Sequence, residues 1–517
     1  MQMSVISTNE VVIIDKVEHN PLTYAGYPAW ASLYNINDHS VIPLGMKSNA
    51  FCAGGSWLSN GTLINVGGDE ATKAMNGTLM FRNTDGRQSI RFYTPGQKSH
   101  SFKEWSHRIH LTVRRWYPGM ARLDDGSVLI GGGCKYNTLM NNKTNNQPSW
   151  EFYPPKNING HRGTPIHSPF LVDSLNANLF PHLISLTNGN VFVAAQKLTM
   201  IYNWRKNKET RLPSIPNGVS VTYPLAGTAI MLPLTKANKY TPEILICGGS
   251  AINDTLPRSK ISTEDPASKQ CVRMKMTKAG IKKGWVIEQM PEARLMPDAV
   301  HLPDGTIFIV NGAQSGVQGI GGYKDRFGTS DADNPVYTPV LYNPNAPIKL
   351  RFDRKGFVSS TIARMYHSSA SLTANGTIMI AGSNPNIDIT TTTKYPTEYR
   401  VEFFYPPYMF KRRPSYSNLP AHVHFNKNYI LDVQLPSTYT NHSRYNVQLM
   451  DLGFHTHAVG MHLRSVELDA KLINNNQLVI TMPKNGKIYP PGPGFIFFVV
   501  DGVPSKAEKT IVVRNKP

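Results

Sequence analysis

The 517-residue chain has only four cysteines and no long hydrophobic run. Four cysteines are too few for a disulfide-based scaffold, and their spacing does not match a zinc site. No window is long and apolar enough to cross a bilayer, so we expect no membrane span. The first residues, MQMSVISTNEVVIIDKV, also lack the basic and apolar regions of a signal peptide.

Acidic residues are scarce relative to basic ones. Lys and Arg number 54 and Asp and Glu 34, which gives a net charge of +20. The basic residues are scattered along the chain, and no recognition helix or zinc spacing accompanies them, so we do not expect nucleic-acid binding. We interpret the charge as a solvated basic surface, with an acidic polysaccharide or cell wall as the alternative partner.

Sites for N-glycosylation are comparatively frequent. Each is weak evidence alone, but together they favour a secreted or cell-wall-associated protein, although no signal peptide is visible in the chain. The six acceptor sequences begin at Asn60, Asn76, Asn142, Asn253, Asn375 and Asn441.

A repeated hairpin pattern dominates the first four hundred residues. Each unit has an apolar strand, a tight polar turn and a second β-branched strand that mostly ends in glycine. Six turns lie at Asn9, Asn60, Asp125, Asn188, Asp304 and Asn375, and a seventh unit, from Tyr223 to Ser250, has a longer insertion instead.

Seven such units predict an all-β fold, a seven-bladed Kelch-type β-propeller over residues 1–400. The first unit begins at Met1 already inside a hairpin, so we expect the first blade to be incomplete at the N-terminus. After about residue 400 the pattern changes to alternating strands with Pro and Gly turns. Residues 401–517 therefore predict an immunoglobulin-like β-sandwich.

The phase of the repeat brings chemically active residues to one structural position. Equivalent positions in a propeller lie on a ring about its axis, so residues distant in sequence can converge there. Counting eight residues back from five of the turns gives Cys52, Tyr117, Phe180, Met296 and His367, and Tyr366 directly precedes the last.

This set favours a transition-metal site. Imidazole and phenolate are suitable ligands for copper(II). A second histidine is available in GFHTHAVGMHLR of the C-terminal region, where His455 and His457 share one face of an extended strand. A loop from that region could enter the channel. Taken singly, each of these residues is as well explained by a structural role in the core.

At these residues the sequence resembles the copper radical oxidases, and among them fungal glyoxal oxidase more than galactose oxidase. The segments NAFCAGGSWLSNGTLINVGGD, RRWYPGMARLDDGSVLIGGG, RMYHSSASLTANGTIMIAGSNPN and THAVGMHLRSVEL are similar to family segments and occur in family order. The resemblance covers nearly the whole chain.

The resemblance implies a role for five residues. Cys52 and Tyr117 would form a thioether-linked cofactor that carries a radical, and Tyr117 would also be a copper ligand. Tyr366 would be the axial ligand and general base, and His367 and His457 the histidine ligands of one copper ion.

The resemblance leaves some positions open. His457 is preferred because it follows threonine in the family's Thr-His pair, with His455 and His462 as alternatives. Cys247 and Cys271 match the family's disulfide, which leaves Cys134 as a free thiol.

One aromatic residue of galactose oxidase is missing from its expected place. A tryptophan that stacks on the modified tyrosine of that enzyme would fall near Cys134 and Lys135. The shield is therefore absent or supplied from elsewhere, and galactose specificity is in doubt.

The resemblance implies an oxidase that converts small aldehydes, as hydrates, or α-hydroxycarbonyls to carboxylic acids while dioxygen becomes hydrogen peroxide. A primary-alcohol or sugar oxidase of the same mechanism is one alternative, and a catalytically silent Kelch-type adhesion protein of the cell wall is another. The expected partners are the substrate, dioxygen and peroxidases that use the peroxide, and we expect a monomer.

Overall fold

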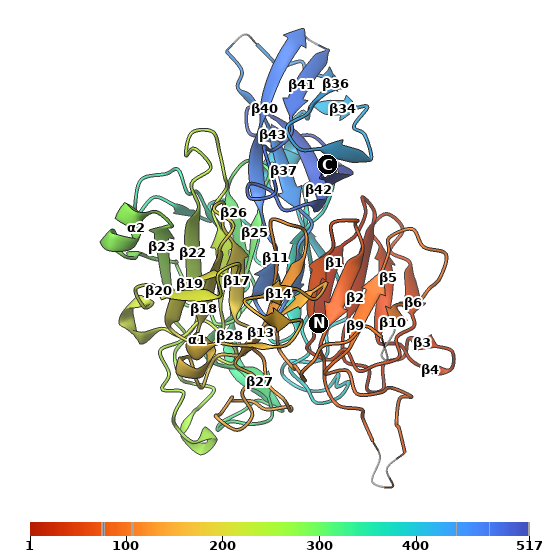
Figure 1. Cartoon of the computed structure of the whole chain (residues 1–517), viewed down its shortest axis with the longest axis vertical. Coiled ribbons are helices and arrows are strands. Elements are labelled where there is room, and N and C mark those ends of the chain that lie inside the picture. Colours follow the sequence, from red (N-terminus) through yellow and green to blue (C-terminus); the bar gives the residue numbers. More distant parts are fainter. Residues whose placement is uncertain (74–75, 77, 105–107, 441, 475, 515–517) are drawn as a thin grey trace.

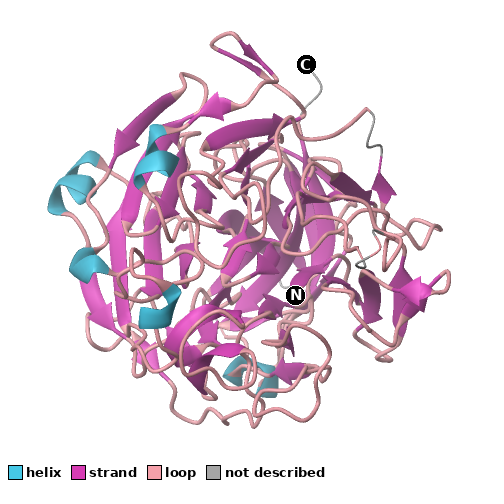
Figure 2. Cartoon of the chain, turned by 90° about the horizontal axis from the view of Figure 1, so that it is seen from below, coloured by secondary structure: helices cyan, strands magenta, loops and turns pink. Residues whose placement is uncertain are grey.

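Seven antiparallel sheets surround a central axis in the computed structural model, which describes residues 1–514 except 74, 75, 77, 105–107, 441 and 475. They are the blades of a propeller, and a C-terminal domain lies above it in Figure 1. Figure 2 shows the strands ranged around the centre of the propeller. The predicted seven-bladed propeller is confirmed.

Each blade has its first strand innermost. Blades 1 to 3 consist of β1 (Gln2–Val5), β2 (Glu10–Ile14), β5 (Ala31–Asn35) and β6 (Val41–Leu44); β7 (Gly54–Trp57), β8 (Leu63–Val66), β9 (Ile90–Tyr93) and β10 (Lys103–Glu104); and β11 (Gly119–Arg122), β12 (Val128–Gly131), β13 (Ser149–Tyr153) and β16 (Ile166–His167).

Blades 4 to 7 continue the ring in the same way. They consist of β17 (His182–Ser185), β18 (Val191–Ala195), β19 (Leu198–Asn203) and β20 (Lys208–Arg211); β21 (Gly227–Met231), β22 (Glu243–Gly248), β23 (Gln270–Lys275) and β24 (Val286–Gln289); β25 (Asp298–His301), β26 (Ile307–Val310), β29 (Val340–Tyr342) and β30 (Phe352–Asp353); and β31 (Ser368–Leu372), β32 (Ile378–Gly382) and β33 (Glu402–Phe404).

Short strand pairs, helices and 3-10 turns lie in the loops between these strands. They are the pairs β3 (Thr23–Tyr24) and β4 (Tyr27–Pro28), β14 (Asn157–Ile158) and β15 (His161–Arg162), β27 (Ala313–Ile320) and β28 (Ser330–Pro335), the helices α1 (Pro169–Asp173) and α2 (Lys278–Lys283), and the 3-10 turns η1 (Pro216–Gly218), η2 (Arg258–Lys260) and η3 (Pro407–Phe410).

The hairpin of blade 2 illustrates why the repeat folds as it does. The Asn60 side chain accepts a hydrogen bond from the Thr62 N–H at 3.0 Å, and Gly61 adopts a φ of 81° that a side chain would disfavour. Both strands of this hairpin, β7 and β8, are buried at every residue. Buried strands of this kind pack against neighbouring blades on both faces, and the turn sets their register.

The first blade is not incomplete, contrary to the sequence prediction. It has four strands of its own, whereas blade 7 has three among the described residues. The propeller also extends slightly beyond residue 400, because β33 pairs with β32 through Phe404. The first strand of the C-terminal domain begins at Ser415, so the change of domain falls between these two residues.

The C-terminal domain is one continuous sheet that curls on itself. The strand β40 (Ser465–Asn474) pairs with β37 (Tyr445–Asp451) through its first half and with β41 (Gln477–Thr481) through its second half. The remaining strands are β34 (Ser415–Ser417), β35 (His422–His424), β36 (Asn428–Gln434), β42 (Gly492–Val500), β43 (Val503–Pro504) and β44 (Glu508–Val513).

One hairpin of this domain enters the propeller. Its strands are β38 (Phe454–Thr456) and β39 (Val459–Met461), and β38 pairs with β1, so that the hairpin extends the innermost edge of blade 1. The strand β39 contacts the inner strands β11, β17, β21 and β25. The C-terminal domain thus reaches the axis, as the sequence suggested. In the described part of the chain, no helix has the length and apolarity needed to span a membrane.

Candidate metal centre

The five residues that share one repeat phase also share one backbone conformation. Cys52, Tyr117, Phe180, Met296 and His367 have φ angles of 56°, 58°, 51°, 49° and 65°. Residues other than glycine seldom adopt this left-handed region, and it recurs here one or two residues before an innermost strand. The position therefore recurs in blades 2, 3, 4, 6 and 7, whatever side chain occupies it.

Backbone hydrogen bonds join these positions around the axis. The Tyr117 N–H donates to the Cys52 carbonyl at 3.3 Å, and the Phe180 N–H donates to the Tyr117 carbonyl at 3.0 Å. These bonds hold the start of each inner strand against the preceding blade. The positions predicted from repeat spacing are therefore linked by hydrogen bonds from Cys52 through Tyr117 to Phe180.

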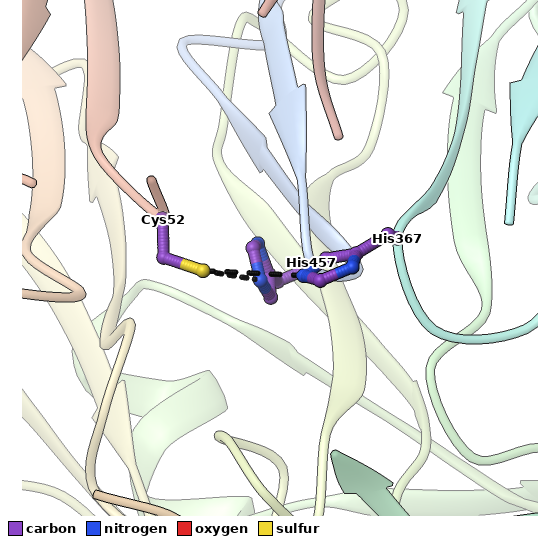
Figure 3. A group of neighbouring side chains, drawn as sticks. All are labelled: Cys52, His367 and His457. Carbon is purple, nitrogen blue, oxygen red and sulfur yellow. Dashed lines mark hydrogen bonds between the residues drawn. The ribbon is translucent and has the colours of Figure 1, made fainter. Parts of the chain in front are cut away.

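Three of the predicted residues form a compact buried group. The ligand atoms of Cys52, His367 and His457 all lie within 4.8 Å of one another. The Cys52 Sγ is 3.2 Å from His457 Nε2 and 4.0 Å from His367 Nε2, and Figure 3 shows the sulfur directed at the two imidazoles. His457 belongs to the turn between β38 and β39, so the hairpin from the C-terminal domain completes this group.

Hydrogen bonds fix the orientation of both imidazoles. His367 Nδ1 donates to the Asn384 carbonyl at 3.0 Å. The Thr456 hydroxyl donates to the Met1 carbonyl at 3.1 Å, so it accepts from His457 Nδ1, which is 2.6 Å away. Each Nε2 is then free of a proton and faces the centre of the group, which is the state a metal ligand requires.

Two tyrosine hydroxyls meet beside the imidazoles. The hydroxyls of Tyr117 and Tyr366 are 2.5 Å apart, and both side chains are buried. The Tyr366 ring stacks on His367 with centroids 3.8 Å apart, and the Tyr117 ring lies 5.1 Å from that of His457. The structure thus brings all five predicted site residues together.

Burial keeps the site neutral in the protein without metal. It raises the pKa of Tyr117, Tyr366 and the Cys52 thiol well above their ordinary values, because desolvation disfavours the charged forms. Burial likewise lowers the pKa of His367 and His457 well below the usual value. A divalent cation would supply the charge that makes buried phenolates favourable.

The aromatic shield comes from Trp116, the residue directly before Tyr117. The two rings stack with centroids 3.8 Å apart and planes 30° apart. The sequence analysis placed the missing tryptophan near Cys134 and Lys135 and did not identify this replacement. Cys134 instead donates its thiol hydrogen to the Tyr136 carbonyl at 3.2 Å and is buried.

A third tyrosine, Tyr223, was missed by the sequence reasoning. Its ring lies 4.5 Å from that of Tyr117 and 6.1 Å from that of Tyr366. Tyr223 is the first residue of the repeat that has a long insertion in place of a tight turn, so counting back from a turn could not find it. Its burial raises its pKa well above the ordinary value of tyrosine.

The tyrosines form the floor of a cavity of about 450 Å³, a size typical of small-molecule sites. Its floor consists of Trp116, Tyr117, Tyr223 and Tyr366, and its walls carry both apolar and charged groups. The charged residues are Lys16, Glu18, Asp69 and Arg258.

Charges in the cavity wall are largely compensated. Lys16 forms an ion pair with Glu18 at 3.0 Å, and burial raises the pKa of Glu18 to about 7. The Asn137 amide donates to Asp69 at 3.0 Å. Arg258 has no ion pair within the described residues and is exposed to solvent.

The alternative histidines lie outside the group. His462 accepts from the Arg122 N–H at 2.7 Å and donates through its other nitrogen to the Gly55 carbonyl at 2.9 Å. His455 is buried on β38, and neither ring nitrogen has a hydrogen-bond partner among the described residues. Away from the site, Cys247 and Cys271 form a disulfide between β22 and β23.

Comparisons with known proteins agree with this geometry. Residues 2–408 match the family model described as glyoxal oxidase N-terminus, and residues 413–512 match the galactose oxidase-like, Early set domain. The chain is 32% identical over 496 residues to "Aldehyde oxidase GLOX" of Vitis pseudoreticulata, an alignment that covers 93% of this chain and 85% of the relative.

Two further similarities extend the comparison. The chain is 29% identical over 501 residues to "Aldehyde oxidase GLOX1" of Arabidopsis thaliana, with 93% of this chain and 74% of the relative covered. The solved structure of a fungal alcohol oxidase of the AA5 family, in complex with copper, superposes with a TM-score of 0.74 at 19% identity and covers 99% of this chain and 96% of that one. The chain therefore belongs to the glyoxal oxidase and galactose oxidase-like family of copper radical oxidases.

Proposed function

We propose that the protein oxidises small aldehydes, as their hydrates, to carboxylic acids while reducing dioxygen to hydrogen peroxide. The observation that carries the proposal is the convergence of two phenols, two imidazoles and one thiol at the floor of a cavity. The names of the two plant relatives, both aldehyde oxidases, support aldehydes as the substrate class.

The donor set fits copper. Tyr117, Tyr366, His367 and His457 would hold one ion, because imidazole and phenolate suit copper(II) and both imidazoles present an unprotonated Nε2. Bound copper supplies a Lewis acid and one of the two one-electron acceptors that a two-electron oxidation needs. The second acceptor must come from the protein.

Cys52 and Tyr117 would provide that second acceptor. The Cys52 carbonyl accepts a hydrogen bond from the Tyr117 N–H, and both side chains are fully buried. A thioether between Sγ and the phenol ring would form with loss of two hydrogens, which dioxygen accepts. Sulfur on the ring makes the phenol easier to oxidise, and Trp116 stacked on it would shield the oxidised form from solvent.

Tyr366 would act as general base. It lies in the cavity floor with its oxygen 2.5 Å from that of Tyr117, so a substrate hydroxyl placed there can transfer its proton to Tyr366 while its C–H hydrogen faces Tyr117. Substrate plus water thus lose two electrons and two protons in total, and dioxygen takes both and leaves as peroxide. Peroxidases that use this peroxide are the partners that we propose.

An extracellular location fits the surface of the molecule. Asn60, Asn76, Asn142 and Asn253 are exposed and could accept glycans. Asn375 is less available, because its side-chain oxygen accepts from Arg413 at 3.0 Å. Asn441 lies outside the described residues. We propose a secreted or wall-associated monomer, for which the Cys247–Cys271 disulfide is a second line of support.

The test is a peroxide assay on copper-loaded, oxidant-activated protein with methylglyoxal, glyoxal, glyoxylate, glycerol and galactose. Glyoxylate is included because Arg258 lines the cavity without an ion pair among the described residues. Peroxide from the aldehydes, with a broad visible to near-infrared radical band, is expected. Peroxide from glycerol or galactose alone would move the substrate class to alcohols, and folded protein that binds copper without producing peroxide would favour the silent adhesion protein.

A further inference from the structure

Tyr223 occupies a position that the mechanism above does not use. Its N–H donates to the Leu179 carbonyl at 3.1 Å, which anchors the start of blade 5 to the preceding blade. The side chain is 1% exposed, yet it lines the cavity together with Tyr117 and Tyr366. The third phenol is therefore fixed beside the place where the reacting carbon must lie.

The hydroxyl of Tyr223 is not committed to the protein scaffold. Its ring lies 4.5 Å from that of Tyr117 and 6.1 Å from that of Tyr366, and among the described residues no carbonyl or carboxylate holds its hydroxyl. When those two phenols bind copper as phenolates, the Tyr223 hydroxyl keeps a hydrogen that it can donate to a further oxygen.

Most other polar groups of the cavity are already engaged. Asn49 donates to the Glu70 carbonyl at 2.6 Å and accepts from the Phe51 N–H at 2.9 Å. The Thr138 hydroxyl donates to the Met140 carbonyl at 2.7 Å. These groups are not free to bind substrate without losing a protein hydrogen bond. The indole N–H groups of Trp30 and Trp116 also lack a partner among the described residues. Tyr223 differs from them in that its ring lies close to both phenols, 4.5 Å from Tyr117 and 6.1 Å from Tyr366.

The chemistry of the substrate supplies the matching acceptor. A hydrated aldehyde carries two hydroxyls on the reacting carbon, whereas a primary alcohol carries one. One hydroxyl must lie where Tyr366 can accept its proton, so the second points to another part of the wall. An alcohol has only hydrogen at that place, and a donor there distinguishes the two substrates.

We propose that the Tyr223 hydroxyl donates a hydrogen bond to the second hydroxyl of the hydrated aldehyde, which makes Tyr223 the residue that favours hydrates over primary alcohols. The proposal rests on the proposed function, because it assumes that both substrates bind through one hydroxyl next to Tyr366. It assigns Tyr223 a role in specificity, separate from the oxidation itself.

The test compares Tyr223→Phe with wild type on the copper-loaded protein. Phenylalanine keeps the ring that packs against Tyr117 and removes only the hydroxyl. The first readout is binding without turnover: the copper(II) absorption of radical-free protein is titrated with methylglyoxal hydrate and with a primary alcohol of similar size. We expect the dissociation constant of the hydrate to rise about tenfold and that of the alcohol to change less than about twofold.

The second readout is kcat/KM for the same two substrates, together with the radical band of the oxidised protein. We expect the preference for hydrate over alcohol to fall about tenfold while the band is unchanged. Tyr408→Phe is the matched control, because it also removes a buried hydroxyl, which donates to the Gly376 carbonyl at 2.6 Å in blade 7 and does not line the cavity. We expect this variant to have the wild-type kcat/KM for both substrates.

The outcomes separate this proposal from the proposed function. If Tyr223→Phe weakened the binding of hydrate and alcohol equally, or changed the binding of neither, the role of Tyr223 would be overturned. Wild-type protein that yields no peroxide from any aldehyde would instead overturn the proposed function, and the binding titration without turnover would still decide whether the hydroxyl contacts a hydrate.

Discussion

The same backbone position carries reactive residues on one side of the propeller and apolar residues on the other. Cys52, Tyr117 and His367 occupy it in blades 2, 3 and 7, whereas Phe180 and Met296 occupy it in blades 4 and 6. All five have a left-handed φ angle between 49° and 65°. The propeller therefore supplies the position, and the side chain decides whether it serves chemistry or packing.

The apolar side contributes to the site indirectly. The Phe180 ring lies 4.6 Å from that of Tyr117 and 4.8 Å from that of His457. Such contacts fix both rings and exclude water from the group, which strengthens every electrostatic interaction there. Substitutions on the reactive side should remove function at little cost in stability, and those on the apolar side should do the reverse.

Cys52→Ser should give the largest effect. Serine cannot form the thioether, so we expect activity to fall more than about 100-fold and the radical band to disappear, while copper remains bound. Peroxide production and the visible spectrum measure this. Cys134→Ser, at the other buried free cysteine, is the matched control and should change activity less than about twofold. Full turnover in Cys52→Ser would defeat the radical assignment.

His457→Ala should weaken copper binding more than about 100-fold, because it removes a ligand. The matched variant is His455→Ala, which lies two residues earlier on the same hairpin and whose ring nitrogens have no partner among the described residues. We expect it to change copper affinity less than about threefold. Equilibrium dialysis with copper compares the two, and the reverse order would transfer the ligand role to His455.

Phe180→Leu should lower the free energy of unfolding by about 1–2 kcal/mol, because it leaves a small gap beside Tyr117. Copper affinity should change less than about threefold. Denaturant unfolding and dialysis on the same preparation provide both numbers. A loss of copper binding as large as that of His457→Ala would mean that the apolar side of the ring has a direct part in the site.

Asp298→Asn should give a smaller effect that depends on pH. Asp298 follows Met296 by two residues on the apolar side, and burial raises its pKa to about 7. The folded protein then binds more protons than the unfolded chain between about pH 4 and 7, so this group's contribution to stability falls as pH rises through that range.

Asparagine does not titrate, so the variant does not lose this stability as the pH rises. The Tm of Asp298→Asn minus that of wild type should be larger at pH 8 than at pH 5. Thermal unfolding at the two pH values measures the difference. An equal Tm difference at pH 5 and pH 8 would show that Asp298 of the folded protein is ionised at both pH values.

Much of the fold was predictable because the hairpins are local. Asn-Gly and Asp-Gly turns mark five of the seven blades, and the spacing from turn to strand start identifies Cys52, Tyr117 and His367 without any long-range information. The strand count of the first blade was not predictable, because β5 pairs with β2 across a loop that carries no turn signal of this kind, and β6 then pairs with β5.

The site was less completely predictable than the fold. Trp116 was overlooked because a residue beside Tyr117 in sequence was not expected to stack on its ring, yet their centroids are 3.8 Å apart. Tyr223 was missed because its repeat has a long insertion in place of the tight turn from which the other positions were counted. The choice of His457 over His455 depended on the family resemblance, because alternation alone places both histidines on one face. The hydrogen bond between Thr456 and His457 supplies the physical difference.

The most direct test of the account is peptide mass spectrometry after the protein has been exposed to copper and dioxygen. The account predicts that the peptides containing Cys52 and Tyr117 are joined, with a mass two hydrogens below their sum, and that Cys52→Ser yields separate peptides. Separate peptides from wild-type protein that has bound copper and reacted with dioxygen would contradict it.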